Sequence, residues 1–403
     1  MTPFPQCAKC GACTAVCPVY QVTGRESHTA RGRLHLLETA GNDDPQLADI
    51  FSKCLLCGAC RDVCPRGIDI PALIAEARAT IPQAKGFSTF AQFLIRQALA
   101  HPLALAVLGK TAGPLGLSPG LPEESGLRLA LFNRPPGLAP VDGDADIAPG
   151  TVSPAAKPVL YFSGCLARHL APAIGLAAET LLARLCDSRL LVPDQQSCCG
   201  LAASSAGDAT QAQELARRTI TLFSREAVQG LPILTTCASC YAGLKAYPAI
   251  LAHDPEWHGR AMAFAQRVEE FSSFILKHKT DSGPGFKTNP FPLRLVYHDP
   301  CHLRFAGITR QPRQLIGQAP GLELVELPHG AQCCGMGGLF HLAHGDLSND
   351  IRKRLIDDFL TTGAELATTT CSGCLLQWQR GLAAAGSSAR ATHLAILLAQ
   401  QLP

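Results

Sequence analysis

The chain contains 403 residues, of which 47% are hydrophobic and 17% are charged, and 19 are cysteines. This composition excludes a disordered chain and is typical of a folded protein of two or three domains. The formal net charge of +3 omits any metal-bound thiolates, so it supports no inference of nucleic-acid binding.

The cysteines are expected to be reduced thiols rather than disulfides. The first seven residues contain neither a basic segment nor an apolar run, so we expect no secretory signal. The longest uncharged apolar stretch, around Gln97 to Gly109, is too short to span a bilayer. We therefore expect a cytoplasmic protein in which cysteines serve as metal ligands.

Residues 1–82 contain two copies of a cysteine run in which three closely spaced cysteines precede a Cys-Pro pair. This spacing is typical of bacterial ferredoxins, where the fourth cysteine of each run ligates the cluster of the other run. The alternative, a pair of zinc sites or inert thiols, does not account for the triple spacing and the trailing proline. The sequence thus predicts two [4Fe–4S] cubanes, one bound by Cys7, Cys10, Cys13 and Cys64 and the other by Cys54, Cys57, Cys60 and Cys17.

Between these runs, the stretch Thr29–Glu38 has a helical pattern. Residues 1–82 therefore resemble the helical ferredoxin domain of respiratory iron–sulfur subunits. Arg31 and Arg33 on this helix either compensate the charge of a cluster or belong to a solvated helical face.

Residues 83–157 contain no cysteine. We expect a helical segment from about Gly86 to Leu108, followed by a linker rich in proline and glycine. The amphipathic stretch from Phe90 to Leu108 either packs on the core, docks on a partner or lies against a membrane.

The remaining chain is an internal repeat of five cysteines. Each copy has a single cysteine, then Cys-Cys-Gly, then Cys-x-x-Cys, at a nearly constant offset. The first copy contains Cys165, Cys198, Cys199, Cys237 and Cys240, and the second contains Cys301, Cys333, Cys334, Cys371 and Cys374. The last cysteine, Cys186, is expected to be a core residue at the end of a helix.

Short apolar runs precede each cysteine group, and helical patterns follow them. The predicted strands are 159–162, 190–192, 233–236, 293–297, 322–325 and 366–370, and the predicted helices include 167–185, 209–226 and 348–360. Strand-then-helix repetition predicts a parallel sheet in each copy, with the cysteines at its carboxyl edge. The fold class is therefore a multidomain chain with an α-helical ferredoxin domain followed by two repeated α/β domains, over residues 158–290 and 291–403.

The five-cysteine pattern resembles the cysteine-rich CCG domains of heterodisulfide reductase. That resemblance implies one or two further [4Fe–4S] clusters of non-cubane form, although a cubane or zinc remains an alternative. Backbone N–H groups of Gly335–Gly338 either approach a cluster or form a tight turn. Nearby histidines serve either as proton relays or as structural residues, and they are His298, His302, His329 and His341.

Substrate chemistry is expected to lie in another subunit. The chain contains no Gly-x-Gly-x-x-Gly motif between a strand and a helix, and no arrangement of a nucleophile, a histidine and an acid is visible. The sequence therefore predicts an electron carrier that needs a partner.

The order of modules across nearly the whole chain resembles the iron–sulfur subunit of glycolate oxidase. Arg31-Gly-Arg33, Pro300-Cys-His302 and the two Cys-Cys-Gly motifs carry this resemblance. Similar architecture occurs in iron–sulfur subunits of D-lactate dehydrogenases, anaerobic glycerol-3-phosphate dehydrogenase and heterodisulfide reductase. Both final Cys-x-x-Cys pairs are complete, which favours the last two branches and leaves the narrower assignment open.

The resemblance implies that an FAD-containing partner oxidises a 2-hydroxy acid such as glycolate or D-lactate. Electrons then pass through this chain toward quinone or another acceptor, with the chain peripheral at the inner face of the cytoplasmic membrane. One alternative is a catalytic protein that reduces a disulfide at its own cluster. Another is an iron–sulfur sensor or assembly scaffold, but the sequence shows no nucleic-acid-binding module.

Overall fold

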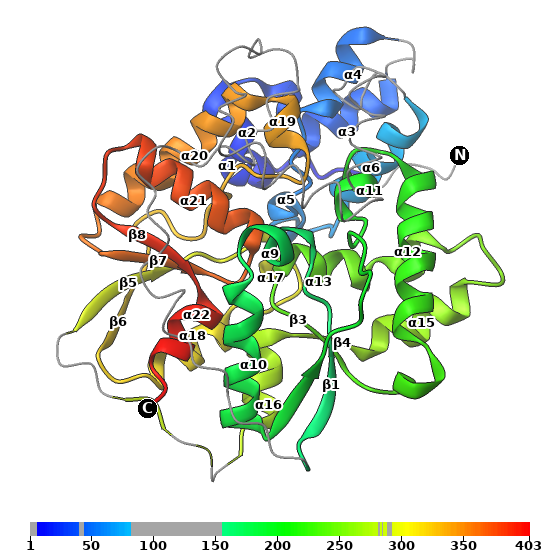
Figure 1. The fold of residues 1–403 in the computed structure, drawn as a ribbon. Helices are drawn as coiled ribbons and strands as arrows, with labels where there is room; N and C mark the ends of the chain where they lie inside the picture. The colour runs from blue at the N-terminus through cyan, green and yellow to red at the C-terminus, as the bar shows by residue number, and fades with distance from the viewer. Residues whose placement is uncertain (1–5, 40–43, 82–154, 281–282, 284, 288–291) are drawn as a thin grey trace, which may run out of the picture.

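The computed structural model describes residues 6–39, 44–81, 155–280, 283, 285–287 and 292–403. They form a helical amino-terminal domain and two α/β units, with the helical domain above the carboxyl edges of the strands (Figure 1). Residues 82–154 lie outside the described residues. This range includes the expected helical segment, with the amphipathic stretch Phe90–Leu108, and nearly all of the expected linker.

All regular secondary structure in the described part of the amino-terminal domain is helical. Asp44 and Asp69 cap two of its helices by accepting hydrogen bonds from the backbone N–H groups of Gln46 and Ala72. The helix predicted between the cysteine runs is present. The elements are α1 (Ala12–Val16), α2 (Pro18–Thr23), η1 (Glu26–His28), α3 (Ala30–Thr39), α4 (Pro45–Ser52), α5 (Ala59–Asp62) and α6 (Ile70–Thr80).

The two α/β units repeat the same sequence of strands. The first contains β1 (Lys157–Tyr161), α9 (Cys165–Leu170), α10 (Ala173–Cys186), β2 (Ser188–Leu191), α11 (Leu201–Ser205), α12 (Ala209–Phe223), η4 (Glu226–Val228), β3 (Ile233–Thr235), α13 (Ala238–Lys245), α14 (Tyr247–Ile250), α15 (His258–Arg267), β4 (Val268–Glu270) and α16 (Phe271–His278). The second contains β5 (Leu293–Tyr297), α17 (Cys301–Phe305), α18 (Arg310–Gly317), β6 (Leu322–Val325), α19 (Phe340–Ala343), α20 (Gly345–Leu360), β7 (Leu366–Thr369), α21 (Ser372–Ala384), β8 (Arg390–His393) and α22 (Leu394–Gln400).

Each unit has a four-stranded, fully parallel sheet, as predicted. The strand orders are β2-β1-β3-β4 and β6-β5-β7-β8, so the two sheets have the same topology. The predicted strands account for the first three strands of each sheet. The fourth strands, β4 and β8, carry no cysteine motif and were not predicted.

One helix that was predicted to be continuous is divided in two in the structure. The stretch 167–185 forms two helices, α9 and α10, which are separated at Ala171 and Pro172. Proline has no backbone N–H to donate to the preceding turn, so the helical hydrogen bonding is interrupted there. The break lets Cys165 stand at the start of a short helix of its own.

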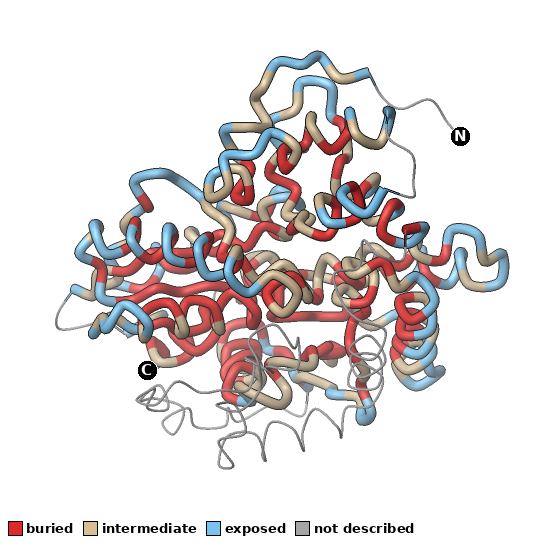
Figure 2. Tube along the Cα trace, turned by 90° about the horizontal axis from the view of Figure 1, so that it is seen from above, coloured by how far each residue is buried: buried red, intermediate tan, exposed pale blue. Residues whose placement is uncertain are grey.

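A continuous hydrophobic core runs through both units. It includes strand residues such as Leu160 and Leu295, and helix α10 of the first unit packs against α22 of the second. Figure 2 shows this core as a band of buried residues across the two units. The helical domain has a separate core around Leu34, Phe51 and Ile74.

A smaller apolar cluster joins the helical domain to the second unit. Val19 and Leu55 of the helical domain pack there with Phe340 and Ile351 of the second unit. The repeat therefore forms one body, and the helical domain docks on it through its own contacts.

Candidate metal centres

The cysteines of each α/β unit meet at the carboxyl edge of its sheet. Cys165 and Cys301 are the first residues of the helices that follow β1 and β5. Cys237 and Cys371 cap the helices that follow β3 and β7. The partial positive charge of helix amino termini favours thiolates at these positions.

The unit 1 set, defined as Cys165, Cys198, Cys199, Cys237 and Cys240, forms a chain of interacting thiols. Cys198 interacts with Cys165 and Cys199, and Cys240 interacts with Cys199 and Cys237. All five sulfur atoms therefore lie in one cluster.

The glycines beside this set have no room for a side chain. A Cβ atom at Gly164 would lie 2.7 Å from Cys240 Sγ, and one at Gly243 would lie 3.0 Å from Cys199 Sγ. Gly164 also has a φ of 74°, which disfavours other residues. The backbone is thus shaped around the sulfur atoms.

The unit 2 set, defined as Cys301, Cys333, Cys334, Cys371 and Cys374, repeats this arrangement. The Sγ atoms of Cys334 and Cys374 are 3.2 Å apart. The backbone N–H of Gly335 donates to Cys333 Sγ at 3.4 Å.

The thiols in both sets shift one another's pKa values, some upward and some downward. Hydrogen bonds from Cys198 and Cys240 lower the pKa of Cys199 to about 5. The neighbouring Cys199 and Cys237, together with burial, raise the pKa of Cys240 well above its usual range. In the second unit, Cys333 and Cys374 likewise hold the pKa of Cys334 well below its usual range. Such crowded sulfurs cannot all ionise without a compensating cation.

The donor chemistry fits an iron–sulfur group. Five sulfur donors in one cluster, four of them buried in each unit, are soft ligands, which suit iron–sulfur clusters or zinc. Structural zinc takes four ligands in a tetrahedral arrangement. Five converging sulfurs therefore fit a multi-iron cluster better than a single zinc ion.

In the helical domain, the two cysteine runs have the same local backbone. Lys9 and Leu56, each just before the second cysteine of its run, have φ values of 53° and 54°. Gly11 and Gly58, just after that cysteine, have φ values of 80° and 76°. Non-glycine residues rarely adopt this conformation, and its recurrence at functional sites indicates a loop wrapped around a ligand.

Ferredoxin set 2, defined as Cys17, Cys54, Cys57 and Cys60, is brought together as the crossed ligand pattern expects. Burial raises the pKa of Cys60, and the nearby thiols of Cys54, Cys57 and Cys17 raise it further. Cys17, which comes from the first cysteine run, therefore lies beside the three cysteines of the second run.

Ferredoxin set 1, defined as Cys7, Cys10, Cys13 and Cys64, lies closer to the surface. Cys10 is exposed, whereas the other three are half-buried. Arg31 forms an ion pair with Glu26 and is near Cys7 and Cys13.

Two buried arginines support ferredoxin set 2. Arg33 donates to the backbone carbonyls of His28, Ile50 and Lys53, and its charge acts on Cys17. Of the two arginines singled out in the sequence, Arg33 is thus buried rather than part of a solvated face. Sequence reasoning missed the second buried arginine, Arg78, which lies on α6 beside Cys54.

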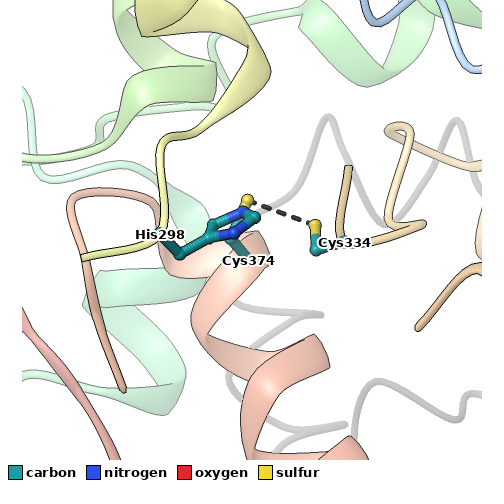
Figure 3. Close-up of side chains that lie close together, drawn as sticks. All are labelled: His298, Cys334 and Cys374. Atoms are coloured by element: carbon teal, nitrogen blue, oxygen red, sulfur yellow. Dashed lines mark hydrogen bonds between the residues drawn. The ribbon is translucent and has the colours of Figure 1, made fainter. Parts of the chain in front are cut away.

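The histidines near the second unit differ in position. His298 is buried within 4.8 Å of both Cys334 Sγ and Cys374 Sγ (Figure 3). His302 interacts with Ser239 of the first unit, at 3.3 Å. His341 is also buried. His329, by contrast, is exposed, and its ring forms a hydrogen bond with Asp358.

His298 makes the two units unequal. It occupies the position that Phe162 has in the first unit, one residue after the end of the corresponding strand. The sequence signal for this difference was the alignment of the two repeats around Tyr161 and Tyr297.

Comparisons with known proteins agree with this architecture. Residues 4–68 match a family described as a 4Fe-4S dicluster domain, and residues 159–245 and 295–379 both match a family described as a cysteine-rich domain. A Bacillus subtilis protein described as "Probable glycolate oxidase iron-sulfur subunit" is 31% identical over 97% of this chain and 92% of its own length. The chain belongs to the glycolate oxidase iron–sulfur subunit family.

Two shorter relatives each match 60% of this chain. Lactate utilization protein A of an Exiguobacterium species is 31% identical over 60% of this chain and 96% of its own length. Lactate utilization protein A of Geobacillus kaustophilus is 31% identical over 60% of this chain and 98% of its own length.

A solved structure shares the fold. It is titled as a hypothetical protein from Helicobacter pylori and has a TM-score of 0.52 and 11% identity, covering 95% of this chain and 66% of its own. At this identity the likeness supports the fold alone. Among the described residues of this chain, no helix is long and apolar enough to cross a bilayer.

Proposed function

We propose that this chain is the iron–sulfur electron-transfer subunit of a 2-hydroxy-acid dehydrogenase complex. In this proposal a partner subunit carries FAD and oxidises glycolate or D-lactate. This chain passes the electrons toward quinone or another acceptor, and a quinone acceptor places the complex at the inner face of the cytoplasmic membrane.

The two ferredoxin sets are proposed to bind one [4Fe–4S] cubane each, and the unit 1 and unit 2 sets are proposed to bind a further [4Fe–4S] cluster each, of non-cubane form. When bound, such clusters accept and release single electrons with little structural change. The chain holds thiolates at helix amino termini and donates a backbone N–H from Gly335 to Cys333. It excludes water by burying eight of the ten ligand cysteines of the two α/β units.

The observation that carries this proposal is the gathering of fourteen cysteines into three sulfur sets, ferredoxin set 2, the unit 1 set and the unit 2 set, within one folded assembly. Cys186, the cysteine outside the four sets, lies at the end of α10 in the hydrophobic core, as expected. The sequence has no dinucleotide-binding motif of its own. The descriptions of the relatives, glycolate oxidase iron–sulfur subunit and lactate utilization protein A, support this class of donor.

The test begins with the chain purified anaerobically. Iron and sulfide should be present in the amounts that four clusters require, and dithionite should produce paramagnetic resonance signals. Colourless protein without such signals would refute the proposal.

The donor is identified by adding the flavoprotein partner. The complete complex should reduce a dye with glycolate or D-lactate, and each subunit alone should not. Dye reduction by glycerol 3-phosphate alone would move the assignment to that dehydrogenase. A chain that reduces a disulfide without any flavoprotein would instead be catalytic.

A further inference from the structure

The four cysteine sets are not isolated from one another. Cysteines from different sets meet at three junctions, each between helices that pack together. The paired cysteines are Cys13 with Cys60, Cys57 with Cys301, and Cys237 with Cys371, and Cys57 also interacts with Cys333.

The first pair lies within the helical domain. Cys13 belongs to ferredoxin set 1, and its thiol contributes to the raised pKa of Cys60 in ferredoxin set 2. Helices α1 and α5, which carry these residues, pack together. The two ferredoxin sets are therefore neighbours.

The second pair connects the helical domain to the second unit. The Cys301 thiol and burial raise the pKa of Cys57 well above its usual range. Around this pair the domains pack closely, because a Cβ atom at Gly58 would lie 2.5 Å from the Phe305 ring. The guanidinium of Arg61 lies 4.3 Å from the centre of the same ring.

The third pair connects the two units. Its hydrogen bond with Cys240 lowers the pKa of Cys237, but the Cys371 thiol and burial outweigh this effect and raise it to about 12. Ser239 Oγ lies 3.3 Å from Cys371 Sγ, and the backbone N–H of Ala238 donates to Thr370 O at 2.8 Å. Both cysteines are buried, so this junction is dry.

We infer that the four proposed cluster sites form one linear electron route in the order ferredoxin set 1, ferredoxin set 2, unit 2 set, unit 1 set. The inference rests on the proposed function, because it requires a redox-active cluster at each set. The spatial order differs from the chain order, since the cysteines of the second unit are the ones that meet both ferredoxin set 2 and the unit 1 set. Each step moves one electron between adjacent sites, with no bond formed or broken and no co-reactant consumed.

The ferredoxin set 1 end of this route is its most exposed part. Cys10 of that set is exposed, whereas Cys57, Cys165 and Cys333 are all half-buried. By contrast, Cys57 and Cys301 face each other across a packed domain junction. In the proposed order, ferredoxin set 1 and the unit 1 set are the two ends of the route, and the second unit acts as an internal relay.

The order can be tested with two matched double variants of the full chain. Cys198→Ser with Cys199→Ser removes the proposed site of the first unit, and Cys333→Ser with Cys334→Ser removes that of the second. In dithionite-reduced wild type, we expect spin–spin splitting between ferredoxin set 2 and the unit 2 set. This splitting should persist when the first unit is changed and disappear when the second is changed. The opposite pattern would overturn the proposed order.

A second pair of variants leaves every cysteine in place. Phe305→Ala opens the contact with Gly58, whereas His169→Ala changes the corresponding position on α9 in the first unit. With iron content unchanged, Phe305→Ala should weaken the splitting and slow electron arrival at the first unit after rapid mixing with reductant. His169→Ala should retain wild-type behaviour, and equal effects of the two changes would contradict the route through Cys57 and Cys301.

These outcomes separate two kinds of failure. Wild-type protein without iron or paramagnetic signals would refute the proposed function itself. Signals of the expected number, combined with splitting that follows the first unit, would refute only the order of the sites.

Discussion

Arg78 joins the ferredoxin domain to the rest of the molecule through backbone carbonyls. Its guanidinium donates to the carbonyls of Phe51, Ser52 and Cys54 in its own domain, and to Ser205 O of the first unit at 2.6 Å. Burial lowers its pKa to about 10, so it stays charged at neutral pH. A fixed positive charge therefore lies beside ferredoxin set 2.

Replacing Arg78 with methionine should have two effects. Loss of the charged hydrogen bonds should destabilise the docked ferredoxin domain by about 3 kcal/mol, seen as a lower thermal midpoint. Loss of the cation should also make the midpoint potential of the neighbouring centre more negative in a redox titration followed by paramagnetic resonance. Arg66→Met, at an exposed position of the same domain, is the control, and an equal shift in both variants would contradict this role.

His393 is a second buried residue whose neutral form the fold requires. Its Nδ1 accepts a hydrogen bond from the backbone N–H of Ala395, and its Nε2 donates to Thr236 O of the first unit at 3.0 Å. Protonation of Nδ1 would remove the acceptor and place a charge in the core. Burial accordingly lowers the pKa of His393 to about 4.

The paired units should therefore lose stability in acid. Because the pKa is about 6.5 when unfolded and about 4 when folded, the stabilisation is complete above pH 6.5 and declines as the pH falls toward 4. His393→Asn keeps a capping oxygen but does not titrate, so its thermal midpoint should fall less between pH 7 and pH 5. An identical decline in wild type and variant would show that another group dominates.

At the scale of helices and strands, the sequence predicted elements best where they carry cysteines. The apolar runs before Cys165, Cys237, Cys301 and Cys371 all form strands. Strands β4 and β8 were missed because their short sequences, Val-Glu-Glu and Arg-Ala-Thr-His, have no continuous apolar run. They are stabilised by pairing with β3 and β7, which local sequence does not show.

The Arg-Gly-Arg stretch on α3 illustrates how packing overrides helix propensity. A Cβ atom at Gly32 would overlap the backbone carbonyl of Glu26 in η1. Gly32→Ala should therefore destabilise the protein by about 2 kcal/mol, although alanine favours helices. Gly317→Ala, at the end of α18 in open space, should be neutral or stabilising. Thermal midpoints that move in the same direction would contradict this explanation.

At the scale of the whole molecule, the sequence predicted the neighbouring cysteines of ferredoxin set 2 and of the two unit sets, but not how the sets meet. Spacing within a run is local, so Cys54, Cys57 and Cys60 had to lie together. The contact of Cys57 with Cys301 depends on domain docking through Leu55 and Phe340, which no repeat or periodicity encodes. The docking also requires glycine at position 337, because a Cβ atom there would lie 2.5 Å from Leu55 Cδ2.

The crowding of thiols also determines how the whole molecule should respond to loss of metal. A thiol whose folded pKa lies above its unfolded value stabilises the fold below that unfolded value, and this stabilisation is lost as the pH rises. The raised thiols outnumber the lowered ones among the two α/β sets. The raised thiols are Cys165, Cys198, Cys237, Cys240, Cys301, Cys333 and Cys374, and the lowered ones are Cys199, Cys334 and Cys371.

Iron-free protein should therefore become markedly less stable above about pH 8, near the ordinary thiol pKa. Iron-loaded protein should not, because its ligands are already thiolates and their charge is compensated by the metal. Thermal midpoints of the two forms at pH 7 and pH 10 provide the measurement. If both forms lost stability in parallel, ionisation of lysine or tyrosine side chains, which the two forms share, would be the cause. A decline confined to the iron-free form would show that the cation holds the crowded sulfurs together.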